Sequence, residues 1–233
     1  SSDWGQYGDL QRGNFDRSEM WINRASDVLS NNPGDGRSTG TLKTMKARHI
    51  IETENWETYE LTDSLNSDEL LALGLSAANL GDLDLAQAVA ERLEDLSSQS
   101  PSNTTLNLIS MEISALTMFK KGQEEEAVAL LMEAVSVAEN QSPPRGAASP
   151  LKPVHELAGD LLLAMGSHDK AAELYETSLG RMANRPRALL GAARSYAGMS
   201  DEYNARQKFQ AFYSLWKDTD IAAVDEVEDY LGL

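Results

Sequence analysis

The chain has 233 residues, of which 41% are hydrophobic, so it is long enough to bury one large core or two small ones. Its formal net charge of −17 argues against nucleic acid or an anionic lipid surface as a partner, because such binding depends on Lys and Arg displacing counterions from phosphates. The absence of Cys excludes disulfides, thiolate metal sites and Cys nucleophiles. No apolar run approaches the roughly 18 residues of a membrane-spanning helix, so we expect no membrane insertion.

The first segment, residues 1–65, is predicted to form irregular helix pairs that are degenerate repeats. Residues 8–29 are interpreted as one pair. Residues 42–53 and 56–63 are interpreted as a second pair, with a shortened second helix. Between the two pairs, residues 31–40 read NNPGDGRSTG, a run of residue types that favour turns.

The middle segment, residues 66–219, is predicted to be a helical array. Its helix pairs share a Gly at the turn between their two helices, and these turn residues are Gly81, Gly122 and Gly166. Gly suits such turns because helices commonly end with a residue at positive φ. The turn residues are 41 and 44 positions apart, and we assign the residues beyond 34 to loops. The loops are residues 97–105, SSQSPSNTT, and residues 141–153, QSPPRGAASPLKP.

The last two helix pairs repeat with a strict spacing of 34 residues. Three landmarks recur at this spacing, namely Gly159 and Ala193, Ala171 and Ala205, and Tyr175 and Phe209. Small residues let antiparallel helices approach closely, and an aromatic side chain fills the gap beside them. A period of 34 residues with this pattern is typical of tetratricopeptide helix-turn-helix repeats. We therefore predict an all-α fold in which antiparallel helix pairs stack as an α-solenoid.

Residues 153–209, which begin PVHELAGDLLLAMGSHDKAAELYETSL, resemble the C-terminal half of bacterial tetratricopeptide repeat (TPR) proteins of unassigned function. The resemblance implies a right-handed superhelix with a concave groove that holds an extended peptide or a partner helix, without catalysis. Residues 220–233 are acidic and resemble the polar-faced helix that caps a solenoid. The apolar residues at helical spacing in and beside this cap are Ile221, Val224, Val227 and Leu231.

The groove implied by the resemblance would be lined by the first helix of each pair, on the face opposite its packed partner. The predicted groove residues are Arg48, Glu52, Leu71, Leu75, Asn79, Glu112, Leu116, Phe119, Glu156, Asp160, Arg187, Leu190 and Arg194. They would give a groove with an apolar middle and mixed charge toward its C-terminal end. The alternative is that the apolar members, Leu71, Leu75, Leu116 and Phe119, pack against a neighbouring helix or the capping segment.

Positive charge is concentrated near the C-terminal end of the array. The cluster consists of Arg181, Arg185, Arg187, Arg194, Arg206 and Lys208. Because Arg can bind a carboxylate through two parallel hydrogen bonds, the cluster suits an acidic peptide or a C-terminal carboxylate. The alternative, which we favour, is pairing within the chain with Glu173, Glu176, Asp201 and Glu202.

No catalytic or metal-binding arrangement stands out in the sequence. His49, His155 and His168 are far apart and lack the spacing that places two ligands on one helix face. Acidic runs such as residues 124–126 are expected on the solvated faces of a chain with 37 acids. We therefore predict no enzymatic activity, no cofactor and no metal site.

The sequence thus predicts a non-catalytic scaffold that binds a protein or peptide partner, of unknown identity, through its repeat surface. Two alternatives stay open: an accessory or structural subunit docked by its convex or edge surface in a larger complex, and, less favoured, an acidic metal-dependent enzyme. The chain begins at Ser1 rather than Met, so we expect a processed or truncated N-terminus. The compartment stays open, with the bacterial periplasm or exterior favoured over the cytoplasm.

Overall fold

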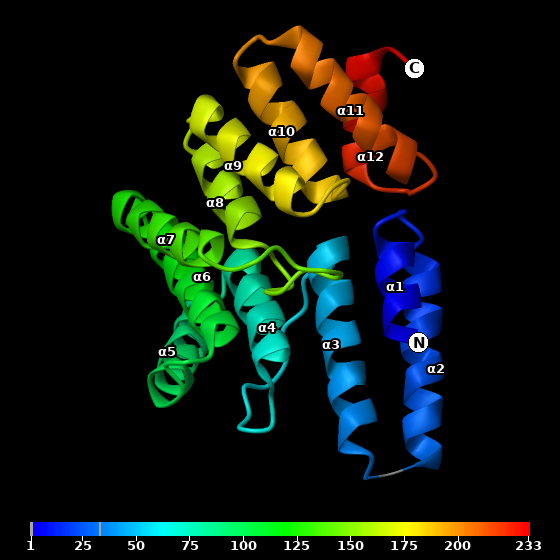
Figure 1. Ribbon diagram of the computed structural model, residues 1–233, viewed down its shortest axis with the longest axis vertical. Helices are drawn as coiled ribbons and strands as arrows, with labels where there is room; N and C mark the ends of the chain where they lie inside the picture. The colour runs from blue at the N-terminus through cyan, green and yellow to red at the C-terminus, as the bar shows by residue number, and fades with distance from the viewer. Residues whose placement is uncertain (1, 33) are drawn as a thin grey trace.

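The structure is a computed structural model that describes residues 2–32 and 34–233. Over these residues it contains twelve helices and no strand (Figure 1). The helices are α1 (Ser2–Leu10), α2 (Phe15–Asn31), α3 (Gly36–Thr53), α4 (Ser67–Leu80), α5 (Leu83–Gln99), α6 (Thr104–Lys120), α7 (Glu124–Glu139), α8 (Val154–Ala164), α9 (His168–Arg181), α10 (Pro186–Gly198), α11 (Glu202–Trp216) and α12 (Ala222–Leu231). Helices α4 to α11 form four consecutive hairpins that pack on one another, which confirms the predicted α-solenoid.

Each hairpin turns at one residue whose backbone has positive φ. Gly81, Gly122 and Gly166 have φ angles of 83°, 83° and 75°, and Ser200 holds the same place in the last hairpin with a φ of 59°. Glycine adopts this conformation without the steric cost that a Cβ atom causes, which explains why three of the four residues are Gly. The three turn residues predicted from the sequence are therefore confirmed.

The third and fourth hairpins pack closely around the ring of Tyr175. A Cβ atom added at Gly159 or at Gly191 would overlap this ring. Ala171 and Ala193 are also fully buried. Because only small side chains leave room for Tyr175, the 34-residue register of small and aromatic residues has a direct cause in helix packing.

The wider spacing between Gly81 and Gly122 comes from longer helices rather than from a loop. Helices α5 and α6 have 17 residues each, whereas α9 and α10 have 14 and 13. Only residues 100–103 separate α5 from α6, so most of the loop predicted at residues 97–105 is helical. Helix α5 ends at Gln99 because Pro101 disfavours helical backbone at the residue before it. The other predicted loop, residues 141–153, does lie between α7 and α8.

Residues 56–63, predicted as a short second helix, form no helix. In this segment Trp56, Tyr59 and Leu61 are partly buried and pack against the core. The hydroxyl of Tyr59 donates a hydrogen bond of 2.6 Å to the carbonyl oxygen of Glu69 in α4. The segment is therefore a strap that crosses from α3 to α4, fixed by apolar side chains at irregular spacing.

The turn predicted at residues 31–40 is shorter than expected. Helix α2 continues to Asn31, and α3 already begins at Gly36. The side chain of Asp35 accepts hydrogen bonds from the backbone N–H groups of Arg37 and Ser38, and this N-cap starts the helix despite its glycines. Pro33, which was part of the predicted turn, lies outside the described residues.

The N-terminal helices return to the last hairpin and close the array. In Figure 1 the turn between α1 and α2 lies next to α11 and α12. Trp216, at the end of α11, is fully buried, and the ring of Phe15 meets it edge-on with centroids 5.3 Å apart. The indole N–H of Trp216 donates to the carbonyl oxygen of Gln11 at 3.3 Å, and the Thr219 hydroxyl donates to that of Gly13 at 3.1 Å. We call these contacts the clasp.

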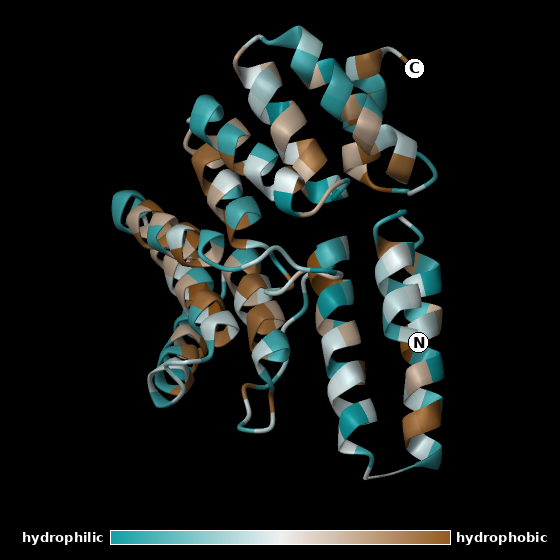
Figure 2. Ribbon diagram, in the orientation of Figure 1, coloured by the Kyte–Doolittle hydropathy of each residue, from teal (hydrophilic) through white to brown (hydrophobic). Residues whose placement is uncertain are grey.

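The distribution of hydrophobic residues follows this architecture. Figure 2 shows them concentrated on α4, α6 and α8 in the middle of the molecule, whereas α2 and α11 are mainly hydrophilic. Helix α12 buries Val224, Val227 and Leu231 in a second core with α10 and α11, and its acids Asp225 and Asp229 are exposed, as expected of a cap. Within the described part of the chain, no helix is long and apolar enough to cross a membrane.

Candidate functional site

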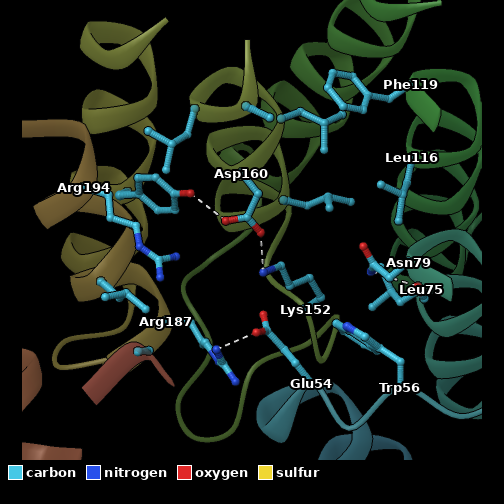
Figure 3. A pocket seen from close by; sticks show the side chains of 18 of the residues that line it. Glu54, Trp56, Leu75, Asn79, Leu116, Phe119, Lys152, Asp160, Arg187 and Arg194 are labelled. Atoms are coloured by element: carbon cyan, nitrogen blue, oxygen red, sulfur yellow. Dashed lines mark hydrogen bonds and ion pairs between the residues drawn. The ribbon is translucent and has the colours of Figure 1, made fainter. Parts of the chain in front are cut away.

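A cavity of about 640 Å³ opens on the inner side of the array, between the first helices of the hairpins (Figure 3). On one side α4 and α6 contribute Leu75, Leu116 and Phe119, which we call the apolar wall. Asn79 extends this side, and its amide donates to the carbonyl oxygen of Leu75 at 2.9 Å. Leu75 and Asn79 share one face of α4, and Leu116 and Phe119 share one face of α6, because each pair is separated by about one helical turn.

On the opposite side α8 and α10 contribute Asp160, Arg187 and Arg194, which we call the charged wall. Figure 3 shows the Arg194 guanidinium directed into the space and the Arg187 guanidinium directed toward Glu54. Apolar residues of the same helices lie between the charges, and they are Leu157, Leu161 and Leu190. The cavity therefore offers apolar surface on one side and mixed apolar and charged surface on the other.

Lys152, from the loop before α8, reaches into the middle of the cavity. Its Nζ lies 2.6 Å from a carboxylate oxygen of Asp160, whose other oxygen accepts a 2.6 Å hydrogen bond from the hydroxyl of Tyr175. Burial alone would lower the pKa of Lys152, but the carboxylates of Asp160, Glu156 and Glu54 outweigh it, so the pKa is raised. Lys152 is thus a fixed cation at neutral pH, not a nucleophilic amine.

The end of α3 and the strap after it close the cavity on a third side through Glu54 and Trp56. The Arg187 guanidinium pairs with the Glu54 carboxylate at 2.7 Å and donates to the carbonyl oxygen of Glu52 at 2.7 and 3.1 Å. The same guanidinium lies 4.9 Å from the ring centroid of Trp216. Arg187 therefore links the cavity to the clasp.

Eight of the thirteen predicted groove residues line this cavity. They are Leu75, Asn79, Leu116, Phe119, Asp160, Arg187, Leu190 and Arg194. Leu75, Leu116 and Leu190 are almost fully buried, whereas Phe119 is half-buried and presents more of its side chain. These apolar residues thus pack against neighbouring helices and also line the space.

The other five predicted groove residues are buried and do not line the cavity. They are Arg48, Glu52, Leu71, Glu112 and Glu156. Three of them, Leu71, Glu112 and Glu156, lie one helical turn before a cavity residue, nearer the start of the helix. Arg48 bonds Asp3 at 2.7 Å and Gln6 at 2.9 Å in α1. In this structure the five are not accessible to a partner.

Arg185, at the start of α10, holds the buried acids in place. Its guanidinium binds both carboxylate oxygens of Glu156, at 2.5 and 3.1 Å, and one oxygen of Glu52 at 3.1 Å. Burial would raise the pKa of Glu156, but Arg185 outweighs it and the pKa is lowered. Glu112 has no hydrogen-bond partner among the residues that the structure describes, and burial raises its pKa.

Positive residues of the predicted cluster pair within the chain, as favoured, but most of them bind groups other than the expected acids. Lys208 does pair with Glu176, at 2.6 Å. Arg194 instead pairs with Glu226 of α12, and Arg181 and Arg206 donate to backbone carbonyl groups. Sequence reasoning identified Glu176 as the partner of a basic residue, but it did not identify the acids supplied by α3 and α12.

Sequence reasoning missed Lys152, Glu54 and Trp56 as cavity residues. They belong to a loop and a strap rather than to the repeated helices, so no register places them. Among residues 2–32 and 34–233, no three His, Asp or Glu side chains come close enough to hold a metal ion.

Comparison with known proteins supports the fold. No family model matches the chain, and no curated protein matches it. The crystal structure of TTC0263, a thermophilic TPR protein in Thermus thermophilus, is similar over 93% of this chain and 100% of that chain, with 15% identity and a TM-score of 0.54. The chain has a tetratricopeptide fold. A mutant of MamA is also similar, over 84% of this chain and 98% of that chain, with 19% identity and a TM-score of 0.42.

The tetratricopeptide fold accounts for the position of the cavity. In the four hairpins, the first helices α4, α6, α8 and α10 supply most of the lining residues. Apart from Tyr175 of α9, the remaining lining residues come from segments outside the repeats, namely the end of α3, the strap, the loop before α8 and the start of α12. The tetratricopeptide array is thus completed into a partly closed site by elements that are not repeats.

Proposed function

We propose that this chain is a non-catalytic scaffold that binds an extended segment of a protein partner in the cavity. The observation that supports this most is the pairing of an apolar wall, Leu75, Leu116 and Phe119, with a charged wall, Asp160, Arg187 and Arg194, across one open space. Such a surface can bury apolar side chains of a ligand while charged groups fix its direction and register.

The size of the cavity favours a short extended segment over a whole helix. Its volume of about 640 Å³ falls in the range of roughly 300–1,000 Å³ that is usual for ligand pockets. A helix with its side chains is roughly 10–12 Å across, and Lys152 and Trp56 project into the space that it would have to occupy (Figure 3).

Selection from a phage-displayed library of random twelve-residue peptides tests the proposal. The affinity of a selected peptide is then measured by fluorescence anisotropy on the unchanged chain, on Phe119→Glu and on Met132→Glu. Phe119 lines the cavity, whereas Met132 lies on α7 outside it and is 42% exposed. We expect Phe119→Glu to weaken binding by at least about tenfold, as for a residue central to an interface, and Met132→Glu to leave it within about twofold. Equal effects of the two variants, or no selected peptide, would count against the proposal.

The second candidate is an accessory subunit that docks through the edge of the array. It is favoured by three exposed apolar residues, Leu80, Met165 and Met199, each of which directly precedes the positive-φ residue of a hairpin. Because they hold equivalent places in three hairpins, they lie along one edge. If the double variant Leu80→Glu, Met199→Glu no longer binds a purified partner and Phe119→Glu still does, this candidate is favoured over cavity binding.

A further inference from the structure

Arg194 already holds a carboxylate in the way an arginine would hold that of a ligand. Its Nε and Nη2 bind the two oxygens of Glu226 at 2.9 and 2.5 Å. Such two-point binding is the preferred geometry of a guanidinium with a carboxylate. Arg194 lines the cavity, and Glu226 comes from α12, outside the repeats.

Helix α12 forms one edge of the cavity next to this pair. Its first residues, Ala222 and Ala223, line the space, and Glu226 follows one helical turn later. The helix is fixed by burial of Val224, Val227 and Leu231 in the second core. Glu226 is therefore not needed to hold α12 in place and can release Arg194 without unfolding the cap.

The Arg194–Glu226 pair is the most exposed of the three ion pairs at the cavity. The side chains of Arg194 and Glu226 are 41% and 40% exposed, whereas those of Lys152 and Arg187 are 12% and 11% exposed. Exposed ion pairs contribute little, about 0–1 kcal/mol, so a competing carboxylate can replace Glu226 at low cost. Lys152 and Arg187, whose own side chains are mostly buried although their acids Asp160 and Glu54 are 43% and 44% exposed, would keep their partners.

Charge around the cavity suits an acidic ligand. Its lining includes Lys120, Lys152, Arg187 and Arg194 against Glu54 and Asp160, in a chain whose net charge is −17. A local excess of bases in an acidic protein attracts carboxylates to this place and repels them elsewhere.

We propose that the ligand is an acidic peptide segment whose carboxylate binds Arg194, and that Glu226 is an internal competitor for this position. The inference rests on the proposed function of the cavity. The acidic cap thereby lowers the affinity of the site for the peptide, because each binding event must displace the Glu226 carboxylate from Arg194.

The test uses the same random peptide library and four variants: Glu226→Gln, Asp229→Asn, Arg194→Gln and Phe119→Glu. Asp229 is an exposed acid of the same helix, so Asp229→Asn makes the same change in net charge and serves as the matched control. We expect selected peptides to be enriched in Asp and Glu. Glu226→Gln should tighten their binding by about threefold to fivefold, the equivalent of up to about 1 kcal/mol, with no such gain for Asp229→Asn.

Arg194→Gln should weaken the same peptides by about tenfold and abolish the gain from Glu226→Gln in the double variant. Two outcomes would overturn the inference and leave the proposed function standing, provided that Phe119→Glu weakens binding of the selected peptides. The peptides could lack acids, or their affinities could respond equally to Glu226→Gln and Asp229→Asn. Failure to select any peptide, or insensitivity to Phe119→Glu, would remove the proposed function and this inference with it.

Discussion

Arg185 and Glu52 are separated by 133 positions in the chain, yet their side chains meet at 3.1 Å, and each is only 2% exposed. Glu156 binds the same guanidinium from α8. The contact joins α3 to the start of α10, so it closes the array between the N-terminal helices and the last hairpin. The clasp between Phe15 and Trp216 closes it a second time, farther toward the C-terminus.

Removal of Arg185 should destabilise the fold strongly. Arg185→Met leaves the Glu52 and Glu156 carboxylates buried without a cation, which costs about 3–5 kcal/mol in other buried pairs. Urea unfolding followed by circular dichroism measures the loss. Arg194→Gln, which breaks an exposed pair, serves as the control and should cost no more than about 1 kcal/mol. A loss below about 1 kcal/mol for Arg185→Met would show that the cluster does not hold the array closed.

Opening of the clasp should loosen the N-terminal helices without unfolding the repeats. Phe15→Ala removes the edge-on contact with Trp216 and should increase hydrogen exchange in α1 and α2 while leaving that in α6 and α7 unchanged. Met20→Ala, on the same helix but 49% exposed, should change neither. Faster exchange throughout the chain after Phe15→Ala would mean that the array folds as one unit with its N-terminal helices.

Glu112 should make the fold less stable as the pH rises. Its pKa is raised above the ordinary value of 4.5, so the folded state retains a proton that the unfolded state loses. Stability therefore falls as the pH rises above about 4.5 and levels off above the folded-state pKa, by about 1.4 kcal/mol for each unit of the raised pKa. Glu112→Gln should remove this decline.

The measurement is the free energy of unfolding between about pH 4 and pH 8 for the unchanged chain and for Glu112→Gln. The variant should gain stability relative to the unchanged chain as the pH rises. Glu125→Gln changes an exposed acid on α7 and should follow the unchanged chain at every pH. Parallel curves for all three proteins would contradict the buried, protonated state of Glu112.

Two glycines should respond in opposite directions to alanine. At Gly191 the added methyl group would overlap the Tyr175 ring, so Gly191→Ala should cost about 1–3 kcal/mol. At Gly180, in α9, nothing lies within 4 Å of the new atom, and Gly180→Ala should stabilise by roughly 0.5–1 kcal/mol. Thermal unfolding of the two variants compares them directly, and a neutral Gly191→Ala would mean that Tyr175 can move away from Asp160 without cost.

The hairpins could be predicted from the sequence because their determinants are local. Gly159, Ala171 and Tyr175 meet within one hairpin, and the same spacing recurs at Ala193, Ala205 and Phe209. Packing within a helix pair depends on residues a few turns apart, which periodicity records. The same register placed Leu116, Phe119 and Asp160 beside the cavity.

The closure of the array could not be predicted in this way. Gly13 and Thr219 meet across 206 positions, and Arg187 meets the carbonyl group of Glu52 across 135. No repeat relates these residues, so nothing in the spacing indicates that α3 returns to α10. Extending the register into α3, which is not part of the array, therefore predicts Arg48 and Glu52 in an open groove, although both are buried. Lys152 and Trp56 are not predicted as cavity residues from the sequence, because they lie outside the repeated helices.

Photo-cross-linking of a selected peptide tests the central claim, binding in the cavity, most directly. A benzophenone amino acid replaces Phe119 on the apolar wall in one protein and Met132 on α7 in another. Illumination should attach the peptide to the protein with the probe at position 119 and not to the protein with the probe at position 132. Attachment at position 132 alone, or equal attachment at both, would contradict binding in the cavity.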